Sequence, residues 1–66
     1  MSAMWAIYRG TELVGGVLAV DELDALVKWV KAQGIDATRD GDVLSVPDEH
    51  FEAVEHLRAT RVEGRA

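Results

Sequence analysis

The chain has 66 residues, a net charge of −5 and 48% hydrophobic residues, so it makes at most one domain, with a small core. It has no cysteine, which excludes disulfides, and its twelve Asp and Glu residues against seven Lys and Arg disfavour nucleic acid, because phosphate neutralisation needs cations. No apolar run approaches the ~20 residues of a membrane span and the first residues lack the features of a signal peptide, so we expect a cytoplasmic single domain over residues 1–66, with a frayed tail at 62–66.

A β-hairpin is predicted at the start of the chain. Residues 4–9 and 13–20 carry the Trp, Ile, Tyr and Val residues that favour strands. Between them, Gly10 begins a two-residue turn of the type II′ kind. Inside the second run, Gly15 and Gly16 indicate a β-bulge or a place where another segment approaches the backbone closely.

A helix with one buried stripe is predicted next. Asp21 or Asp24 can cap or charge its first turn, and Gly34 ends it. Apolar residues recur between them at spacings of three and four, which is typical of the buried face of a helix: Leu23, Leu26, Val27 and Val30.

The second half of the chain shows the same order of patterns. Residues 35–39 and 43–46 predict two short strands, joined by a type I′ turn at Asp40 and Gly41. Pro47 stops the second strand, because it cannot donate a hydrogen bond to a neighbouring strand. It leads into a second helix, whose buried side is predicted to carry Phe51, Val54 and Leu57.

Aligned on their turns, the two halves predict a duplicated ββαββα domain of the α+β class. The expected product is a four-stranded antiparallel sheet with both helices on one face. If two-residue turns set the strand registers, one face of the strands meets the helices. That face is predicted to carry Trp5, Ile7, Val14, Leu18, Val20, Ile35, Ala37, Leu44 and Val46.

The reverse side of the first hairpin is predicted to be apolar as well. It carries Met4, Tyr8, Leu13 and Val17, whereas the reverse side of the second hairpin is mainly polar. Because exposed apolar patches often mark interaction sites, we hypothesise that these four side chains pack against a second copy or another protein. The alternative is a modest patch left in water or covered by the C-terminal tail. Trp29 is a further candidate anchor on a partner, although a Trp at this place on a helix also folds over the rim of its own core.

Residues that carry catalysis or hold metals are sparse. His50 and His56 lie six residues apart, so they point to different sides of the predicted helix and no metal site is expected. The chain has no cysteine and two serines, and no nucleophile can be paired with a base. We therefore expect no catalytic residue, no metal and no cofactor, and no enzymatic activity. The basic C-terminus, with Arg58, Arg61 and Arg65, is explained by the helix dipole or by a nucleic-acid-binding tail.

Two stretches resemble known families. A helix, then Gly-Ile-Asp-Ala at 34–37, a hairpin, Val-Pro at 46–47 and an acidic helix start resemble the ring-building motif of secretion and flagellar basal-body ring proteins. That resemblance implies small modules that pack side by side into rings. Residues 5–15 are similar to the opening hairpins of small bacteriophage proteins, and the Ala- and Val-rich, Lys-poor composition is that of a GC-rich genome. Together these imply an accessory protein of a phage that infects actinobacteria.

The predicted function is a small, non-enzymatic protein-interaction or regulatory module, acting on a host protein or forming a homodimer. Two alternatives stay open. One is a self-assembling oligomerisation module of the ring-building type, and the other is a nucleic-acid-binding regulator.

Overall fold

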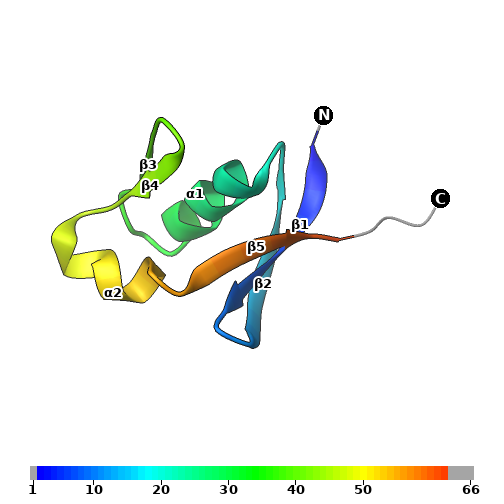
Figure 1. Cartoon of the computed structure of the whole chain (residues 1–66), viewed down its shortest axis with the longest axis horizontal. Coiled ribbons are helices and arrows are strands. Elements are labelled where there is room, and N and C mark those ends of the chain that lie inside the picture. Colours follow the sequence, from blue (N-terminus) through cyan, green and yellow to red (C-terminus); the bar gives the residue numbers. More distant parts are fainter. Residues whose placement is uncertain (1, 63–66) are drawn as a thin grey trace.

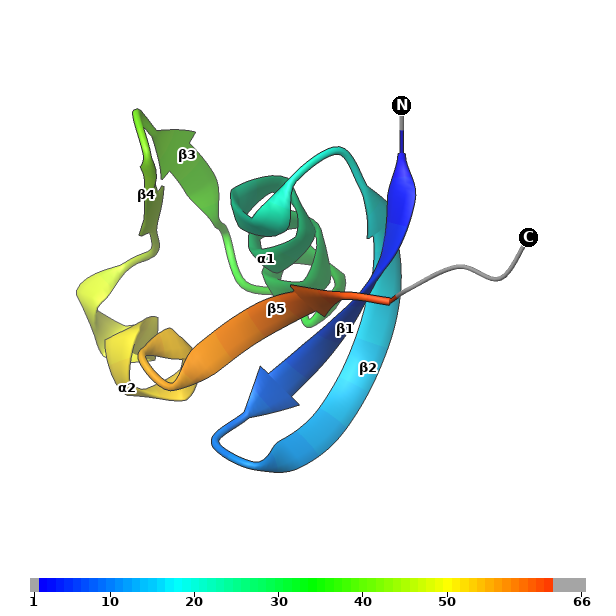
Figure 2. The same cartoon turned by 45° about the vertical axis from the view of Figure 1, so that its right-hand side comes forward.

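The computed structural model describes residues 2–62, which form two antiparallel sheets with one helix between them (Figures 1 and 2). One sheet has three strands in the order β2-β1-β5, and the other is the hairpin β3-β4. The elements are β1 (Ala3–Arg9), β2 (Glu12–Ala19), α1 (Glu22–Ala32), β3 (Thr38–Asp40), β4 (Val43–Ser45), a 3₁₀ turn η1 (Asp48–His50), α2 (Phe51–Val54) and β5 (Leu57–Arg61).

The prediction of one duplicated four-stranded sheet with both helices on one face is wrong, and the cause is β5. The segment Leu57–Arg61 was expected to end the second helix, but it pairs antiparallel with β1. It thereby takes the edge of β1 that β2 leaves free, so β3 and β4 pair only with each other. The second helix is reduced to the short α2, which follows η1.

Both hairpin turns begin with a glycine in the left-handed region. Gly10 has a φ of 61°, as the predicted type II′ turn requires. In the second hairpin Asp40 pairs with Val43, so the turn residues are Gly41 and Asp42, and the predicted type I′ turn at Asp40 and Gly41 is wrong. Gly41 has a φ of 64°, which matches the first turn instead.

A β-bulge in the first hairpin changes which side chains face the core. Tyr8 lies opposite Leu13, but the next residue of β1, Ile7, lies opposite Gly15. Val14 is therefore the extra residue of β2, and every residue after it points to the side opposite from the one that a regular ladder would give.

The bulge reverses the predicted core of the second strand only beyond Val14, which itself packs against the core as predicted. Leu18 and Val20 were expected in the core, but 59% and 57% of their surfaces are exposed. Val17 was expected on the reverse side, and it packs against the core instead. The predictions for β1 are confirmed, because Ile7 is fully buried and Trp5 packs beside it.

Helix α1 is buried on two sides, and this gives the molecule two apolar clusters. The first cluster joins α1 to the three-stranded sheet through Ile7, Ala19, Ala25 and Ala59. The second joins α1 to the hairpin and α2 through Val27, Val30, Ala37 and Val54. The second hairpin's predicted core residues Ile35, Leu44 and Val46 pack against this second cluster, as expected.

The ends of α1 follow the sequence prediction. Asp21 is the N-cap, and its Oδ1 accepts a hydrogen bond of 2.7 Å from the N–H of Asp24. Gly34, with a φ of 86°, follows the last turn. Within residues 2–62, no helix has the length and apolar character needed to cross a bilayer.

The end of the chain is partly described. Val62 was predicted to begin a frayed tail, but its N–H donates a hydrogen bond of 2.9 Å to the carbonyl of Met4 and continues the pairing of β5 with β1. The rest of the predicted tail, residues 63–66, lies outside the described residues.

Candidate functional site

Helix α1 covers one side of the three-stranded sheet (Figure 2). The other side of the sheet carries apolar side chains. The register places Met4 opposite Leu18, and Tyr8 between Leu13 and Arg58. Because residues directly opposite each other share a face and Ile7 points to the core, these side chains point away from α1. We call this surface the open sheet face, formed by Met4, Tyr8, Leu13, Leu18, Arg58 and Val62.

The apolar members of the open sheet face are accessible to a partner. Leu13 is 60% exposed, Leu18 59%, Met4 46% and Val62 45%, and Tyr8 is half-buried. They come from three adjacent strands, so they form a continuous patch and not scattered single residues. A contiguous patch of this kind is the usual mark of an interaction site.

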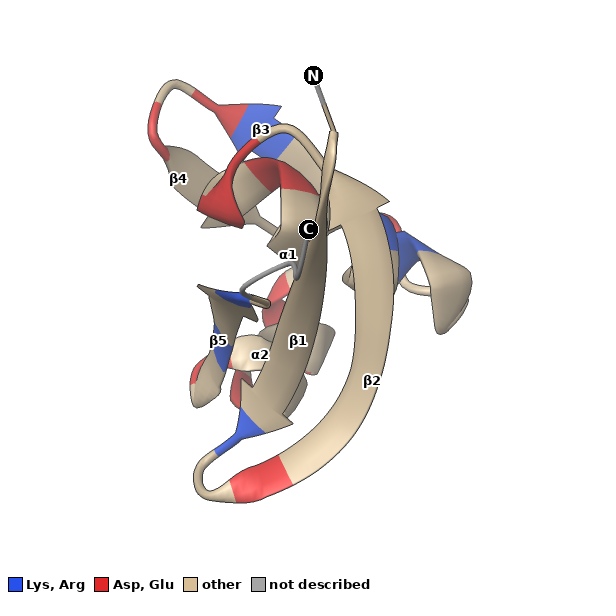
Figure 3. Ribbon diagram, turned by 90° about the vertical axis from the view of Figure 1, so that its right-hand side faces the viewer, with Lys and Arg blue, Asp and Glu red and all other residues tan. Residues whose placement is uncertain are grey.

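The open sheet face carries almost no formal charge. No Asp or Glu occupies an outward position of β1, β2 or β5 in the described register. Its one cation, the Arg58 guanidinium, lies 5.1 Å from the centre of the Tyr8 ring, in a cation–π arrangement. Figure 3 shows β1 and β2 free of acidic and basic residues along most of their length, while acidic residues gather on α1, α2 and the β3-β4 hairpin.

The two edges of the sheet are less suited to binding than its face. The edge strand β5 carries Arg58 and Arg61, and the edge strand β2 contains the bulge at Val14. Charges and bulges on edge strands hinder the addition of another strand. A partner of this sheet is therefore expected on the open sheet face.

Three of the five residues predicted as a partner interface lie together on the open sheet face: Met4, Tyr8 and Leu13. Val17 does not, because the bulge turns it to the core. Sequence reasoning missed Leu18 and Val62. The two glycines that indicated a bulge were the available signal for Leu18. No pattern pointed to Val62, because the alternation over residues 57–60 puts polar side chains on the face that Val62 shares.

Trp29 lies apart from the open sheet face. It is half-buried and packs against both apolar clusters, on the side of the sheet that α1 covers. Its indole ring lies against Gly15 of β2, so closely that a Cβ built at Gly15 would be 2.5 Å from Trp29 Nε1. The hypothesis that Trp29 anchors a partner stays a prediction, and the position of the ring favours a role within the core.

The ionisable side chains are engaged in local contacts. His50 and His56 each lie 3.6 Å from the carboxylate of the preceding glutamate, Glu49 and Glu55. Within residues 2–62, no three His, Asp or Glu side chains gather into a metal site. The pKa of Asp24 is lowered by the N–H of Val20 and by the Lys28 ammonium, which is a structural role at the start of α1.

Comparisons of the chain with known protein families, with curated proteins and with solved structures give no match. The resemblances to the ring-building motif and to small phage proteins therefore stay predictions. The open sheet face is the feature of the fold from which a function can be argued.

Proposed function

We propose that this chain is a non-catalytic protein-interaction domain that self-associates reversibly, with the open sheet face of one copy packed on that of a second. The observation that carries the proposal is the exposure of Met4, Leu13 and Leu18 on a sheet that no element of residues 2–62 covers on that side. A cytoplasmic location is part of the same proposal.

A second copy suits this surface electrostatically. The chain has a net charge of −5, so most of its surface repels another copy. The open sheet face is free of carboxylates, and its one guanidinium is held over Tyr8. Packing two such faces together therefore buries apolar surface without bringing the acidic regions into contact.

A chain this short gains stability when a partner buries more of its apolar surface. A core in a domain of this length supplies only roughly 3–5 kcal/mol of stability, and natural domains of this size add a disulfide, a metal or a partner chain. The chain has no cysteine, and residues 2–62 hold no metal cluster. Association is the remaining common source of stability.

The area of the open sheet face predicts a weak dimer. Three strands about 4.8 Å apart, each presenting outward side chains over about 20 Å, make a plane of roughly 300 Å². Two such planes bury roughly 600 Å², less than the ~1,200 Å² of an ordinary stable interface. We therefore expect a rapidly exchanging dimer and not a permanent one.

Sedimentation equilibrium tests the proposal. Wild type is compared over about 20 µM to about 1 mM, a range suited to weak complexes, with Leu18→Asp and with the control Val43→Asp. Leu18 is 59% exposed on the open sheet face and Val43 is 64% exposed on the β3-β4 hairpin, and both substitutions add one negative charge. Wild type and Val43→Asp should dimerise as concentration rises, whereas Leu18→Asp should stay monomeric.

Two results would contradict the proposal. One is a wild-type chain that stays monomeric over the whole range, and the other is equal loss of association in both variants. Circular dichroism of each variant checks that the fold is retained.

A further inference from the structure

A second apolar surface lies on the side of the three-stranded sheet that faces α1, opposite to the open sheet face. It is a groove of about 480 Å³ bounded by α1, β4, α2 and the start of β5. Leu26 and Val54 line it, and Val43 and Phe51 stand at its rim with 64% and 57% of their surfaces exposed. A groove lined by large apolar side chains can receive the apolar residues of another segment.

The groove forms because the apolar side chains of α1 are divided between two clusters. The apolar stripe of the helix includes Leu23 and Leu26, but Ala25 is the residue that packs fully against the sheet. Leu23 and Leu26 are half-buried and line the groove, and Leu26 also packs against the first cluster. The β3-β4 hairpin and α2 cover the C-terminal part of the stripe, where Val27 and Val30 are buried, and leave the N-terminal part open.

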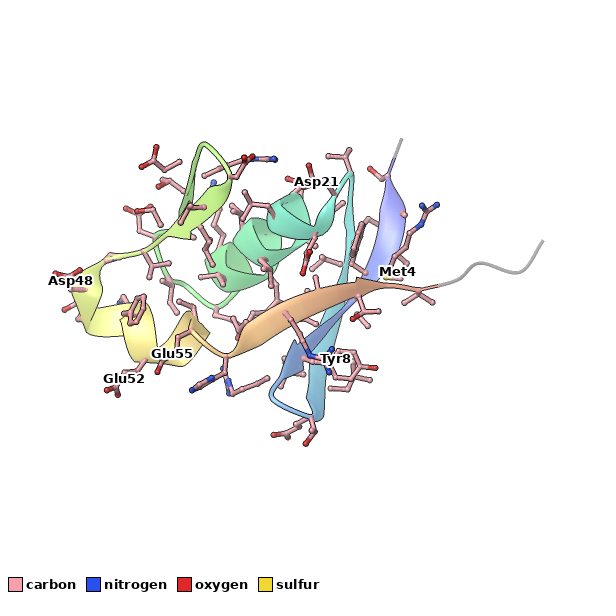
Figure 4. All side chains as sticks on the ribbon, in the orientation of Figure 1. Met4, Tyr8, Asp21, Asp48, Glu52 and Glu55 are labelled. Atoms are coloured by element: carbon pink, nitrogen blue, oxygen red, sulfur yellow. The ribbon has the colours of Figure 1, made fainter. Side chains whose placement is uncertain are left out.

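The groove lies in the acidic half of the molecule. Residues 40–57 contain six carboxylates and no Lys or Arg: Asp40, Asp42, Asp48, Glu49, Glu52 and Glu55. Figure 4 shows Asp48, Glu52 and Glu55 spaced along η1 and α2, at the opposite end of the molecule from Met4 and Tyr8. Asp42 and Glu55 line the groove itself.

Two cations, on α1 and β3, have ionic partners outside this region. Lys28 pairs with Asp24 and Arg39 pairs with Asp21, at 3.1 Å and 3.3 Å, and Arg39 Nε also donates a hydrogen bond of 3.3 Å to the carbonyl of Gly41. Among residues 2–62, none of the six carboxylates of residues 40–57 forms an ion pair with a Lys or Arg. An apolar groove beside uncompensated negative charge is complementary to a segment that is apolar on one side and basic on the other.

We propose that this groove binds a cationic amphipathic helix of a partner protein. Apolar side chains of that helix, spaced i, i+3, i+4 and i+7, enter the groove between Val43 and Phe51, and its Lys or Arg residues face the surrounding carboxylates. A helix is preferred over an added strand because β4 has only three residues, too few for a useful ladder. This inference is independent of the proposed dimer, since the groove lies on the side of the three-stranded sheet that faces α1 and the open sheet face lies on the other side.

A designed peptide tests the proposal directly. The probe is a peptide of about 16 residues of Leu and Lys, with its leucines at helical spacing, and the control peptide has the same composition with the leucines distributed around the helix. Binding is measured by fluorescence anisotropy on the full chain carrying Leu18→Asp, which removes self-association. The patterned peptide should bind at least about tenfold more tightly than the control, a difference of about 1.4 kcal/mol.

Two matched variants locate the binding site. Phe51→Ser, at the rim of the groove, should weaken binding of the patterned peptide by about tenfold or more, as removal of a large aromatic contact does. Leu13→Ser, on the open sheet face and with a similar exposed fraction of 60%, should leave the affinity unchanged. Equal binding of the two peptides, or equal effects of the two variants, would overturn the proposal, as would the absence of binding.

Charge is tested in the same assay. Glu55→Gln removes a carboxylate that lines the groove, and Glu12→Gln removes one on β2 that does not line it. The first should weaken binding several-fold and reduce its salt dependence, and the second should have a smaller effect, because its carboxylate makes no contact inside the groove. Affinities that both variants lower equally would point to bulk attraction and contradict a specific site.

Discussion

At the scale of single residues, the contact between Gly15 and Trp29 is the tightest constraint on the fold. A Cβ at Gly15 would lie 2.5 Å from Trp29 Nε1 and 3.1 Å from its Cδ1, so the indole ring would have to move. Trp29 packs against both apolar clusters, and a shift of its ring disturbs both.

Gly15→Ala is therefore expected to lower the free energy of unfolding by about 1–3 kcal/mol, the usual cost of overpacking. Gly16→Ala is the matched control, because the nearest atoms to its Cβ are the Trp5 carbonyl at 3.4 Å and Met4 Sδ at 3.5 Å, which is ordinary contact. Urea unfolding of the two variants measures the difference. Equal stabilities would show that the indole ring moves at little cost.

The Asp24 carboxylate predicts a pH dependence. Its Oδ2 accepts a hydrogen bond of 3.1 Å from the Val20 N–H and lies 3.1 Å from Lys28 Nζ, and both contacts lower its pKa below the usual 3.8. A lowered pKa in the folded state stabilises the fold above the unfolded pKa, and this contribution is lost as the pH falls through the folded value.

Wild type should therefore be more stable than Asp24→Asn at neutral pH, by less than about 1 kcal/mol because Lys28 is half exposed. The difference between their melting temperatures should shrink as the pH is lowered from about 7 to about 2.5. A difference that stays constant over this range would mean that the ionised form of Asp24 adds nothing to stability.

Some single-residue features could be predicted from sequence and others could not. The cap at Asp21 and the glycine turns are local, because the partner atoms lie within a few residues. The place of Trp29 over Gly15 joins residues 14 positions apart, and no local pattern contains it. The glycine pair did indicate a close approach or a bulge, and both are present at Gly15 and Val14.

At the scale of elements, the largest error concerns the end of the chain. Phe51, Val54 and Leu57 have helical spacing, and this favoured a helix through residue 57. From Leu57 to Thr60, however, apolar and polar residues alternate, and the structure follows the period of two: Leu57 and Ala59 point to the core. Within so few residues the two periods are hard to separate, and the free edge of β1 decides between them.

The error in β5 and the bulge in β2 have different consequences for the candidate site. The bulge moves Val17 into the core and brings Leu18 to the open sheet face, so one apolar residue replaces another. Strand β5 widens the same face with Arg58 and Val62. The apolar reverse side of the first hairpin was therefore predicted correctly as a feature, although part of its membership was wrong.

At the scale of the whole molecule, two surfaces of different chemistry lie on opposite sides of the three-stranded sheet. The open sheet face is apolar and nearly uncharged, which suits a second copy. The groove is apolar with an acidic border, which suits a cationic segment. A dimer formed through the open sheet face would carry two grooves, and both would stay accessible because each lies on the side of its sheet that faces α1, away from the dimer interface.

Self-association of the folded chain also predicts that thermal stability depends on concentration. A second copy that binds the folded state and not the unfolded chain stabilises the fold by mass action. In a domain of this size, 1 kcal/mol changes the melting temperature by roughly 4–8 °C. For a weak dimer we expect wild type to melt about 2–4 °C higher at about 1 mM than at about 20 µM.

Leu18→Asp should melt at the same temperature at both concentrations, and Val43→Asp should behave as wild type does, because Val43 lies on the β3-β4 hairpin. Calorimetry at two scan rates makes the measurement and separates reversible association from aggregation. A wild-type melting temperature that does not rise with concentration would contradict self-association through the open sheet face.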